Sequence, residues 1–115
     1  MKVRMNQNGA VVRFLTPAKE YEVIGLDHES FRVIDDKGEP ILFPKSLFSV
    51  IDDRIPEEWI WDRYAGDEYY ANPPELHEPG FYEDLFDHKP DAVGRFDDYL
   101  RRVGIIGQRQ SRTLV

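Results

Sequence analysis

The first half of the chain is a succession of short apolar stretches, each bounded by turn-forming residues. Alternation of apolar and polar positions, together with β-branched residues, predicts strands over residues 11–15, 20–24, 30–34, 40–43 and 48–51. The second of these is expected to end at Gly25, and Pro44 opens a single helical turn over residues 44–47. Such short strands, with turn signals about every eight to twelve residues, are typical of a small barrel or sandwich.

A resemblance to a known fold accompanies this pattern. Residues 15–25, the turn and return strand at 35–40, and residues 47–52 resemble a small SH3-like barrel. In that fold a meander of strands ends in one tight helical turn before the last strand, as Pro44 and the residues after it suggest here. The resemblance covers roughly the first half of the chain and implies an antiparallel barrel. It implies little about function, because such barrels bind many unrelated ligands.

Aromatic residues mark the next part of the chain. Residues 57–64 and 67–71 flank Ala65-Gly66, and this pattern predicts a hairpin rich in tryptophan and tyrosine. Strand alternation places Trp59 and Trp61 on one face of it. Residues 72–80 contain three prolines and a glycine, so we expect an extended loop without regular structure.

Helices are predicted at the end of the chain. Residues 81–86 suit a short helix whose inward side chains are Phe81, Leu85 and Phe86. A longer helix over residues 90–104 begins at a proline and ends at a glycine. Its predicted apolar stripe is Val93, Phe96, Leu100 and Val103.

These elements predict an α+β fold, in which a small SH3-like antiparallel barrel or meander is followed by an aromatic hairpin and one C-terminal helix. With 115 residues, the chain is expected to form one domain. Its parts are the strand-rich half 1–52, the acidic aromatic hairpin and loop 53–89, the helix 90–104 and the basic tail 105–115.

Composition narrows the classes of function. The chain has no cysteine, so it has no disulfide framework, no thiol nucleophile and no thiolate zinc site. No apolar run approaches the length of a membrane span, and the first residues lack the apolar stretch of a signal peptide. We therefore expect a cytoplasmic protein that does not contact membranes.

The charge is distributed unevenly along the chain. Residues 1–51 carry seven basic and seven acidic side chains, residues 52–100 carry four basic and fifteen acidic ones, and residues 101–115 carry four arginines. A phosphate-binding surface needs clustered lysine and arginine, so the long central segment argues against nucleic acid as a partner. A basic protein surface is the natural partner instead.

The acidic and aromatic segment from residue 52 to residue 87 is the main candidate site. Aromatic anchors surrounded by charge are typical of protein interfaces, in which Trp and Tyr often dominate the binding energy. The alternative is that the aromatic residues form a core and the acids are ordinary solvated surface. The predicted contact residues are Trp61, Asp62, Tyr64, Asp67, Glu68 and Tyr70 on the hairpin, with Glu75, Glu78, Glu83 and Asp84 on the loop and short helix.

A metal or acid–base site is the second candidate. His77, Glu83, Asp87 and His88 are close in sequence, and such side chains bind hard or borderline cations. Their spacing matches no known metal motif, however, and Pro90 interrupts the helix that would align them. We therefore expect no metal, no cofactor and no catalytic residue, and predict a protein that is not an enzyme.

A second resemblance bears on function. The segments Glu68-Tyr69-Tyr70, Pro73-Pro74-Glu75-Leu76 and Pro79-Gly80-Phe81-Tyr82-Glu83-Asp84, in a small acidic chain with a strand-rich first half, are similar in size, charge and texture to immunity proteins of interbacterial toxin systems. The resemblance implies a bacterial inhibitor that covers the basic active-site or substrate-binding surface of a toxin domain. Two alternatives remain open: a non-enzymatic SH3-like interaction or assembly module, and a small metal-dependent enzyme.

Overall fold

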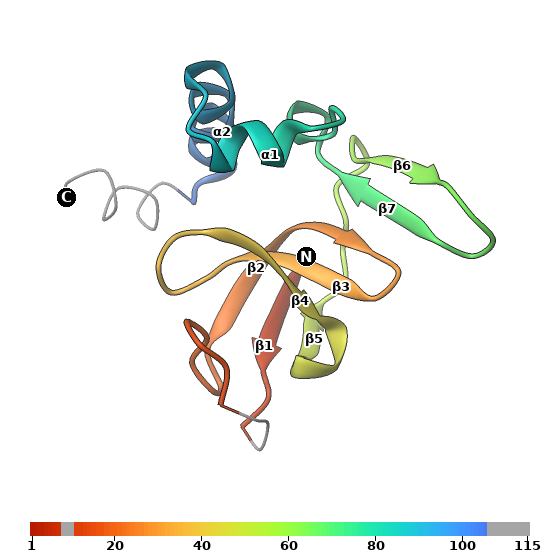
Figure 1. Cartoon of the computed structure of the whole chain (residues 1–115). Helices are drawn as coiled ribbons and strands as arrows, with labels where there is room; N and C mark the ends of the chain where they lie inside the picture. The colour runs from red at the N-terminus through yellow and green to blue at the C-terminus, as the bar shows by residue number, and fades with distance from the viewer. Residues whose placement is uncertain (8–10, 106–115) are drawn as a thin grey trace.

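A computed structural model describes residues 1–7 and 11–105 (Figure 1). Its seven strands are β1 (Lys2–Met5), β2 (Glu20–Asp27), β3 (Ser30–Ile34), β4 (Pro40–Pro44), β5 (Phe48–Asp52), β6 (Ile60–Arg63) and β7 (Tyr69–Asn72). Five of them form one sheet in the order β4-β3-β2-β1-β5, and the hairpin β6–β7 joins this sheet through β2. Every described strand pair is antiparallel. The α+β class predicted from the sequence is confirmed.

The strand order explains why β2 is the longest strand. Its first residues pair with β1, its middle pairs with β3, and Leu26 and Asp27 at its end pair with β7. The register with β3 shifts between Val23 and Gly25, as at a β-bulge, so Gly25 lies inside the strand. The prediction that Gly25 ends the strand is wrong. No described ladder joins β4 to β5, so the sheet is open and the predicted barrel closure is not confirmed.

The first predicted strand is also wrong. Residues 11–15 form a loop with a turn, in which the amide of Leu15 donates to the carbonyl of Val12 and Phe14 has a φ of 68°. Leu15 nevertheless reaches the core, so its apolar character reflects burial from a loop. The strand lies earlier, at Lys2–Met5, where exposed and buried positions alternate. The other four predicted strands and the helical turn, a 3-10 turn at Lys45–Leu47, are confirmed.

Two helices and a second 3-10 turn follow the hairpin. The turn, Pro74–Leu76, lies within the segment predicted to be an extended loop, so that prediction is wrong. Helix α1 spans Phe81–Phe86 and helix α2 spans Pro90–Val103, close to the predicted bounds. Gly104 ends α2 with a φ of 83°, the left-handed conformation that glycine adopts freely.

The buried faces of the helices differ in detail from the prediction. Phe86 is 43% exposed and Val103 is 40% exposed, so neither belongs to the inward stripe predicted for it. The buried positions of α2 are Ala92, Phe96, Tyr99 and Leu100. Ile105 packs against this region, and the rest of the predicted basic tail, from residue 106 on, lies outside the described residues.

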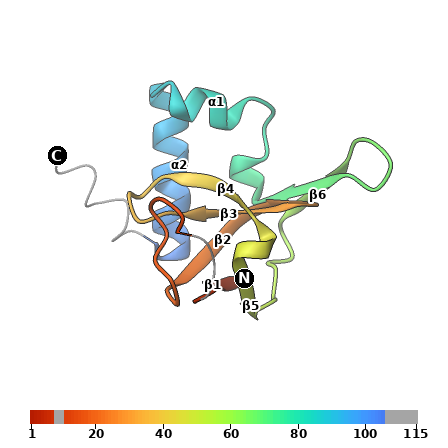
Figure 2. The same ribbon diagram turned by 60° about the horizontal axis from the view of Figure 1, so that its bottom comes forward.

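Two hydrophobic clusters lie on opposite sides of β2 and β3. Val23 and Val33 belong to the first cluster, which also contains Tyr21, Phe31 and Phe48. The next residue of each strand, Ile24 and Ile34, belongs to the second. Successive side chains of a strand point to opposite faces, so these two strands are buried on both sides. The second cluster is completed by α1 and α2, which lie together on one side of the sheet (Figure 2).

Candidate partner-binding surface

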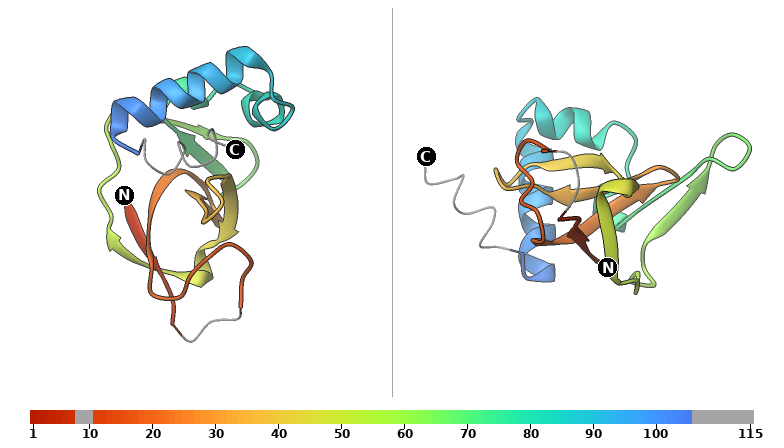
Figure 3. Two further views of the ribbon diagram at one scale, coloured as in Figure 1. Left: turned by 90° about the vertical axis from the view of Figure 1, so that its left-hand side faces the viewer. Right: turned by 90° about the horizontal axis from the view of Figure 1, so that it is seen from below.

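The hairpin β6–β7 projects from the body of the sheet (Figure 3). Its register pairs Trp61 with Ala71, Asp62 with Tyr70 and Arg63 with Tyr69. Its tip turns at residues 64–68, where Gly66 has a φ of 53°. Ala71 is fully buried and pairs with Leu26 of β2, so this pair anchors the base of the hairpin. The aromatic hairpin predicted from the sequence is confirmed.

One face of the hairpin carries an exposed tryptophan. Trp61 is 51% exposed, and its ring lies 5.9 Å from that of Tyr69. Lys45, from the 3-10 turn before β5, donates to the hydroxyl of Tyr69 at 3.2 Å. Trp59, predicted to share this face, precedes β6 and is only 6% exposed within the first cluster, so it serves the core. Trp61 is therefore the only tryptophan that a partner can reach.

The other face carries a row of three rings. Tyr64, 55% exposed, lies 5.4 Å from Tyr70, and the ring of His77 stacks on Tyr70 at 5.2 Å. The hydroxyl of Tyr70 donates to Asp62 at 3.3 Å. Desolvation, and then the negative charge of Asp62, raise the pKa of Tyr70, which keeps its hydroxyl protonated as a donor. Trp61 and Tyr70, both predicted contacts, therefore lie on opposite faces of the hairpin.

His77 ties the hairpin to the 3-10 turn that follows it. Its Nε2 lies 2.7 Å from Asp62 Oδ2, and its Nδ1 lies 3.4 Å from the side-chain nitrogen of Asn72. Because the Asn72 amide nitrogen donates, this network assigns the proton of a neutral imidazole to Nε2. Both ring nitrogens are engaged, so in this arrangement His77 offers no free nitrogen as a base or as a metal ligand.

The tip of the hairpin presents carboxylates to solvent. Asp67 is exposed and has no hydrogen-bond or ion-pair partner among residues 1–7 and 11–105. Glu68 lies 3.8 Å from the Nε2 of His28, which itself lies closer, at 3.2 Å, to Glu29. At 3.8 Å and half exposed, the contact of Glu68 contributes little. Both acids are therefore available to an incoming positive charge.

Glu75 serves the fold. Arg102 of α2 donates to both of its oxygens, at 2.7 Å and 3.1 Å. Burial alone would raise the pKa of Glu75, but the hydrogen bonds from Arg102 outweigh this effect and lower it. This fork joins the turn after the hairpin to the last turn of α2. Glu75 is therefore already neutralised and is a poor contact for a partner.

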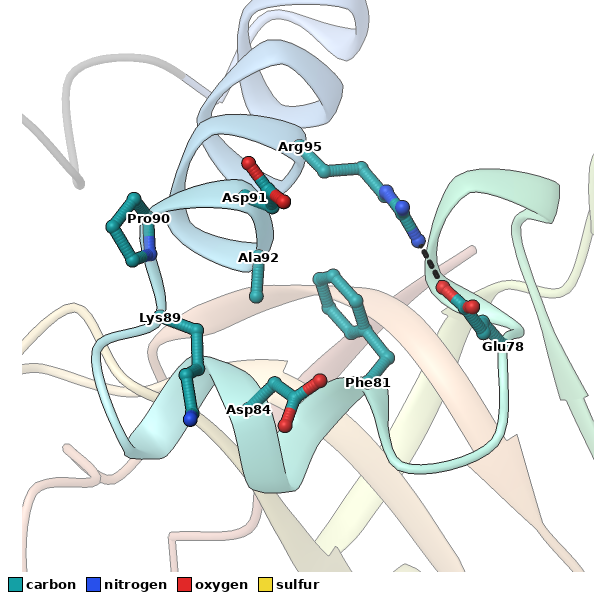
Figure 4. A pocket seen from close by; sticks show the side chains of 8 residues that line it. All are labelled: Glu78, Phe81, Asp84, Lys89, Pro90, Asp91, Ala92 and Arg95. Atoms are coloured by element: carbon teal, nitrogen blue, oxygen red, sulfur yellow. Dashed lines mark hydrogen bonds and ion pairs between the residues drawn. The ribbon is translucent and has the colours of Figure 1, made fainter.

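Glu78 borders a cleft of about 470 Å³ between α1 and the start of α2. Arg95 extends from α2 to the carboxylate of Glu78, and Asp84 and Asp91 bring further carboxylates to the cleft from α1 and α2 (Figure 4). The carboxylate of Asp84 has no ion-pair or hydrogen-bond partner within the part of the chain that the structure describes. Of the two predicted contacts here, Asp84 is available and Glu78 is engaged.

A smaller groove, of about 250 Å³, links this cleft to the hairpin. Tyr70 and His77 line it together with Glu78 and Glu83, and Glu78 and Phe81 are common to both hollows. Glu83 is exposed on α1, and its side chain has no partner among the described residues. The acids of α1 and the second face of the hairpin therefore form one continuous surface.

The structure thus divides the ten predicted contacts into two sets. One set contains exposed rings and carboxylates that are available to a partner: Trp61, Tyr64, Asp67, Glu68, Glu83 and Asp84, of which Glu68 has only its 3.8 Å contact with His28. Side chains engaged within the fold are Asp62, Tyr70, Glu75 and Glu78. His77 and Asn72, which tie the hairpin to the following 3-10 turn, were not predicted as contacts; His77 was considered only as part of the metal or acid–base candidate. Trp61 lies on the other face of the hairpin, away from the continuous surface.

The residues of the predicted metal or acid–base site do not come together. His77 binds Asp62 and Asn72, whereas His88 is exposed beyond α1 with a φ of 59°. Within the described ranges, no three histidine, aspartate or glutamate side chains are grouped so that they could hold a metal ion. No helix in the described ranges is both long enough and apolar enough to cross a bilayer.

Comparison with known proteins finds no match of this chain to any family model, curated protein or solved structure.

Proposed function

We propose that this protein binds a basic protein partner and acts as an immunity protein, which neutralises a bacterial toxin domain by covering its basic active-site or substrate-binding surface. One observation carries the proposal: exposed rings and unpaired carboxylates occur together on a projecting hairpin and on the helix beside it. Trp61 and Tyr64 are the exposed rings, and Asp67 is the clearest unpaired acid.

The charge pattern supports electrostatic steering. Fifteen acidic side chains against four basic ones in residues 52–100 produce a strongly negative field over this half of the molecule. Complementary fields raise the association rate and make that rate fall with salt. Buried aromatic anchors act mainly on the dissociation rate. In this proposal Asp67, Glu68, Glu83 and Asp84 attract the partner, and the rings of Trp61 and Tyr64 hold it.

The proposal places the protein in the bacterial cytoplasm, where a toxin that cuts nucleic acid would act, and gives it no enzymatic activity. It needs no cofactor, because the inhibitor only has to occupy the toxin's surface. Nucleic acid and membranes are not partners in it. The same negative field that attracts a basic protein repels phosphate groups.

Capture from the native source tests the proposal. The protein, immobilised at low salt, is expected to retain one basic protein that raised salt releases and that mass spectrometry identifies. Purified, that protein should bind with an association rate that falls steeply with ionic strength, and its toxic activity should be lost in the complex. A partner that is bound equally well at high salt, or that keeps its activity in the complex, would contradict the proposal.

The SH3-like interaction module is the second candidate. It is supported by the strand order β4-β3-β2-β1-β5 together with the 3-10 turn Lys45–Leu47 directly before β5, the succession expected of an SH3-like meander. Fold alone does not identify a ligand for such a module. A partner bound with little dependence on salt, and insensitive to charge reversal on the hairpin, would favour this alternative.

A further inference from the structure

Strand β6 has an unpaired edge. It pairs with β7 on one side, and no other described strand pairs with it. The amide of Tyr64 donates to the carbonyl of Glu68 across the hairpin. In an antiparallel ladder the direction of the backbone groups alternates, so those of Asp62 point to β7 whereas those of Trp61 and Arg63 point outward. The outward amides have no backbone or side-chain acceptor within residues 1–7 and 11–105.

Exposed apolar side chains lie on both faces of this edge. Ile60 is 41% exposed and Trp61 is 51% exposed, and they point to opposite faces of the strand. Soluble proteins normally protect an open edge, for example by covering it or by inward-pointing charges. Here the edge lies on a hairpin that projects from the body of the molecule (Figure 3). An added strand would find backbone partners and apolar surface on both sides of it.

The charge around the edge selects the strand that would pair with it. Residues 57–70 contain five acidic side chains, Glu57, Glu58, Asp62, Asp67 and Glu68, and one basic side chain, Arg63. We infer that β6 binds its partner by strand addition, accepting an extended segment that carries lysine or arginine at alternate positions. This inference rests on the proposed function and specifies how its partner is held. Backbone hydrogen bonds would supply affinity, and the acids would supply selectivity.

A second copy of the chain is a poorer occupant of this edge. Each chain carries a net charge of −7, and the acids of the two hairpin tips would be brought together in a β6–β6 pair. The edge of β5 is a useful comparison, because among the described strands β5 pairs only with β1, and Val50 is 47% exposed there. The amide of Asn6 donates to the carbonyl of Leu47, so the backbone groups of Leu47 point to β1. By the same alternation along β5, the amide of Val50 points outward.

Amide hydrogen exchange on the full chain tests the inference directly. The probe is a short synthetic peptide that alternates lysine with threonine, and its glutamate–threonine counterpart is the charge control. At a lysine peptide concentration about ten times its Kd, mass action slows exchange about tenfold at an amide that the peptide covers. We expect this slowing at Trp61 and Arg63, no comparable slowing at Val50, and none with the glutamate peptide.

A pair of variants separates backbone pairing from side-chain charge. Arg63→Pro removes the outward amide, and proline is tolerated where an edge amide faces solvent. Arg63→Ala removes the same positive charge but keeps the amide. We expect Arg63→Ala to bind the lysine peptide as tightly as the wild type or more tightly, and Arg63→Pro to bind it at least about tenfold more weakly. The exchange measurement on the wild type decides the question even if the proline variant loses the hairpin.

Each other outcome overturns the inference in a recognisable way. Lysine peptide bound without protection of Trp61 and Arg63 would leave the acidic partner surface in place and remove strand addition. Equal protection at Val50, or by the glutamate peptide, would show unselective edge pairing. Protection that grows with protein concentration alone would make a second copy the occupant. If the lysine peptide does not bind at all, β6 neither pairs with an added strand nor selects a basic one.

Discussion

The side-chain oxygen of Asn72 lies so close to the backbone of Gly25 that a β-carbon on residue 25 would stand 2.5 Å from it. The amide nitrogen of the same Asn72 side chain points to the Nδ1 of His77. His77 in turn binds Asp62 on β6. The absence of a side chain at Gly25 on β2 therefore makes room for the amide of Asn72, which orients His77 and so the link between the hairpin and the loop that follows it.

Replacing this glycine should destabilise the protein through one contact. We expect Gly25→Ala to lower the free energy of unfolding by about 1–3 kcal/mol, the usual range for overpacking a filled site. Asn72→Ala in the same chain removes the oxygen that the new methyl group meets, so the double variant should be less destabilised than the sum of the single ones. Urea denaturation of the four proteins measures this coupling, and strictly additive losses would show that another contact is responsible.

Much of the fold is predictable because its signals are local. Alternation and turn residues placed β3, β4 and the hairpin β6–β7, since each of those strands pairs with a neighbour a few residues away. The first strand was misplaced, because the pattern in residues 11–15 reflects a loop that inserts Leu15 into the core. Gly25 was misread for a related reason, since a tertiary contact with Asn72 requires it inside a strand. Such requirements come from distant partners.

The two phenylalanines predicted to point inward from different helices should now behave differently. Phe96 of α2 is fully buried, and Phe86 of α1 is 43% exposed. We expect Phe96→Ala to lower the free energy of unfolding by about 3–5 kcal/mol, the cost of removing a buried aromatic ring, whereas Phe86→Ala should cost less than about 1 kcal/mol. Equal losses in chemical denaturation would contradict the exposure found for Phe86.

The candidate site was predicted in location but not in detail. Composition identified the acidic aromatic segment, yet it could not separate Glu75, which Arg102 binds, from Asp67, which no described residue binds. Arg102, the partner of Glu75, lies 27 positions away in sequence on α2. The orientation of α2 depends on the packing of its buried face in the second hydrophobic cluster. Side chains that look alike in sequence acquire different roles only when distant elements pack together.

Two neighbouring arginines of α2 provide a matched test of this distinction. Arg102 forms its two-pronged contact with Glu75 across the fold, whereas Arg101 pairs with Asp98 on the surface of its own helix. Both side chains are well exposed, so the effects are modest. We expect Arg102→Ala to lower the free energy of unfolding by about 1 kcal/mol and Arg101→Ala by a few tenths. Thermal denaturation of the two variants should rank them in this order, and the reverse ranking would mean that Glu75 is not held for stability.

Asp36 should account for part of the loss of folding stability at acid pH. Burial alone would raise its pKa, but the bonds from Lys19, Thr16 and Tyr21 outweigh burial and lower it. A carboxyl group whose pKa is lower in the folded than in the unfolded state contributes stability above the unfolded value, about 4, and this contribution is lost as the pH falls below it.

Asp36→Asn should therefore lower Tm near neutral pH and flatten its decline below about pH 4. Thr16→Val, which removes one of the three donors, should flatten the decline only partly. Melting curves collected from neutral pH down to about pH 2 compare these slopes with the wild type. If Tm of the Asp36→Asn protein falls with pH as steeply as that of the wild type, other carboxyl groups cause the loss of stability at acid pH.

Charge reversal at the tip of the hairpin tests the partner surface itself. Asp67 has no described partner and Glu68 only a distant one, so changing both to lysine should leave Tm nearly unchanged. The same change should slow association with the captured basic protein by about tenfold or more at low salt, and the deficit should shrink as salt screens the field. Asp53→Lys with Asp87→Lys changes the net charge equally at two exposed acids outside the predicted contacts. If this control slows association as much, attraction depends on the net charge of the protein and not on the hairpin. If the variant with lysine at 67 and 68 has a clearly lower Tm but binds the partner as the wild type does, the two acids serve the fold.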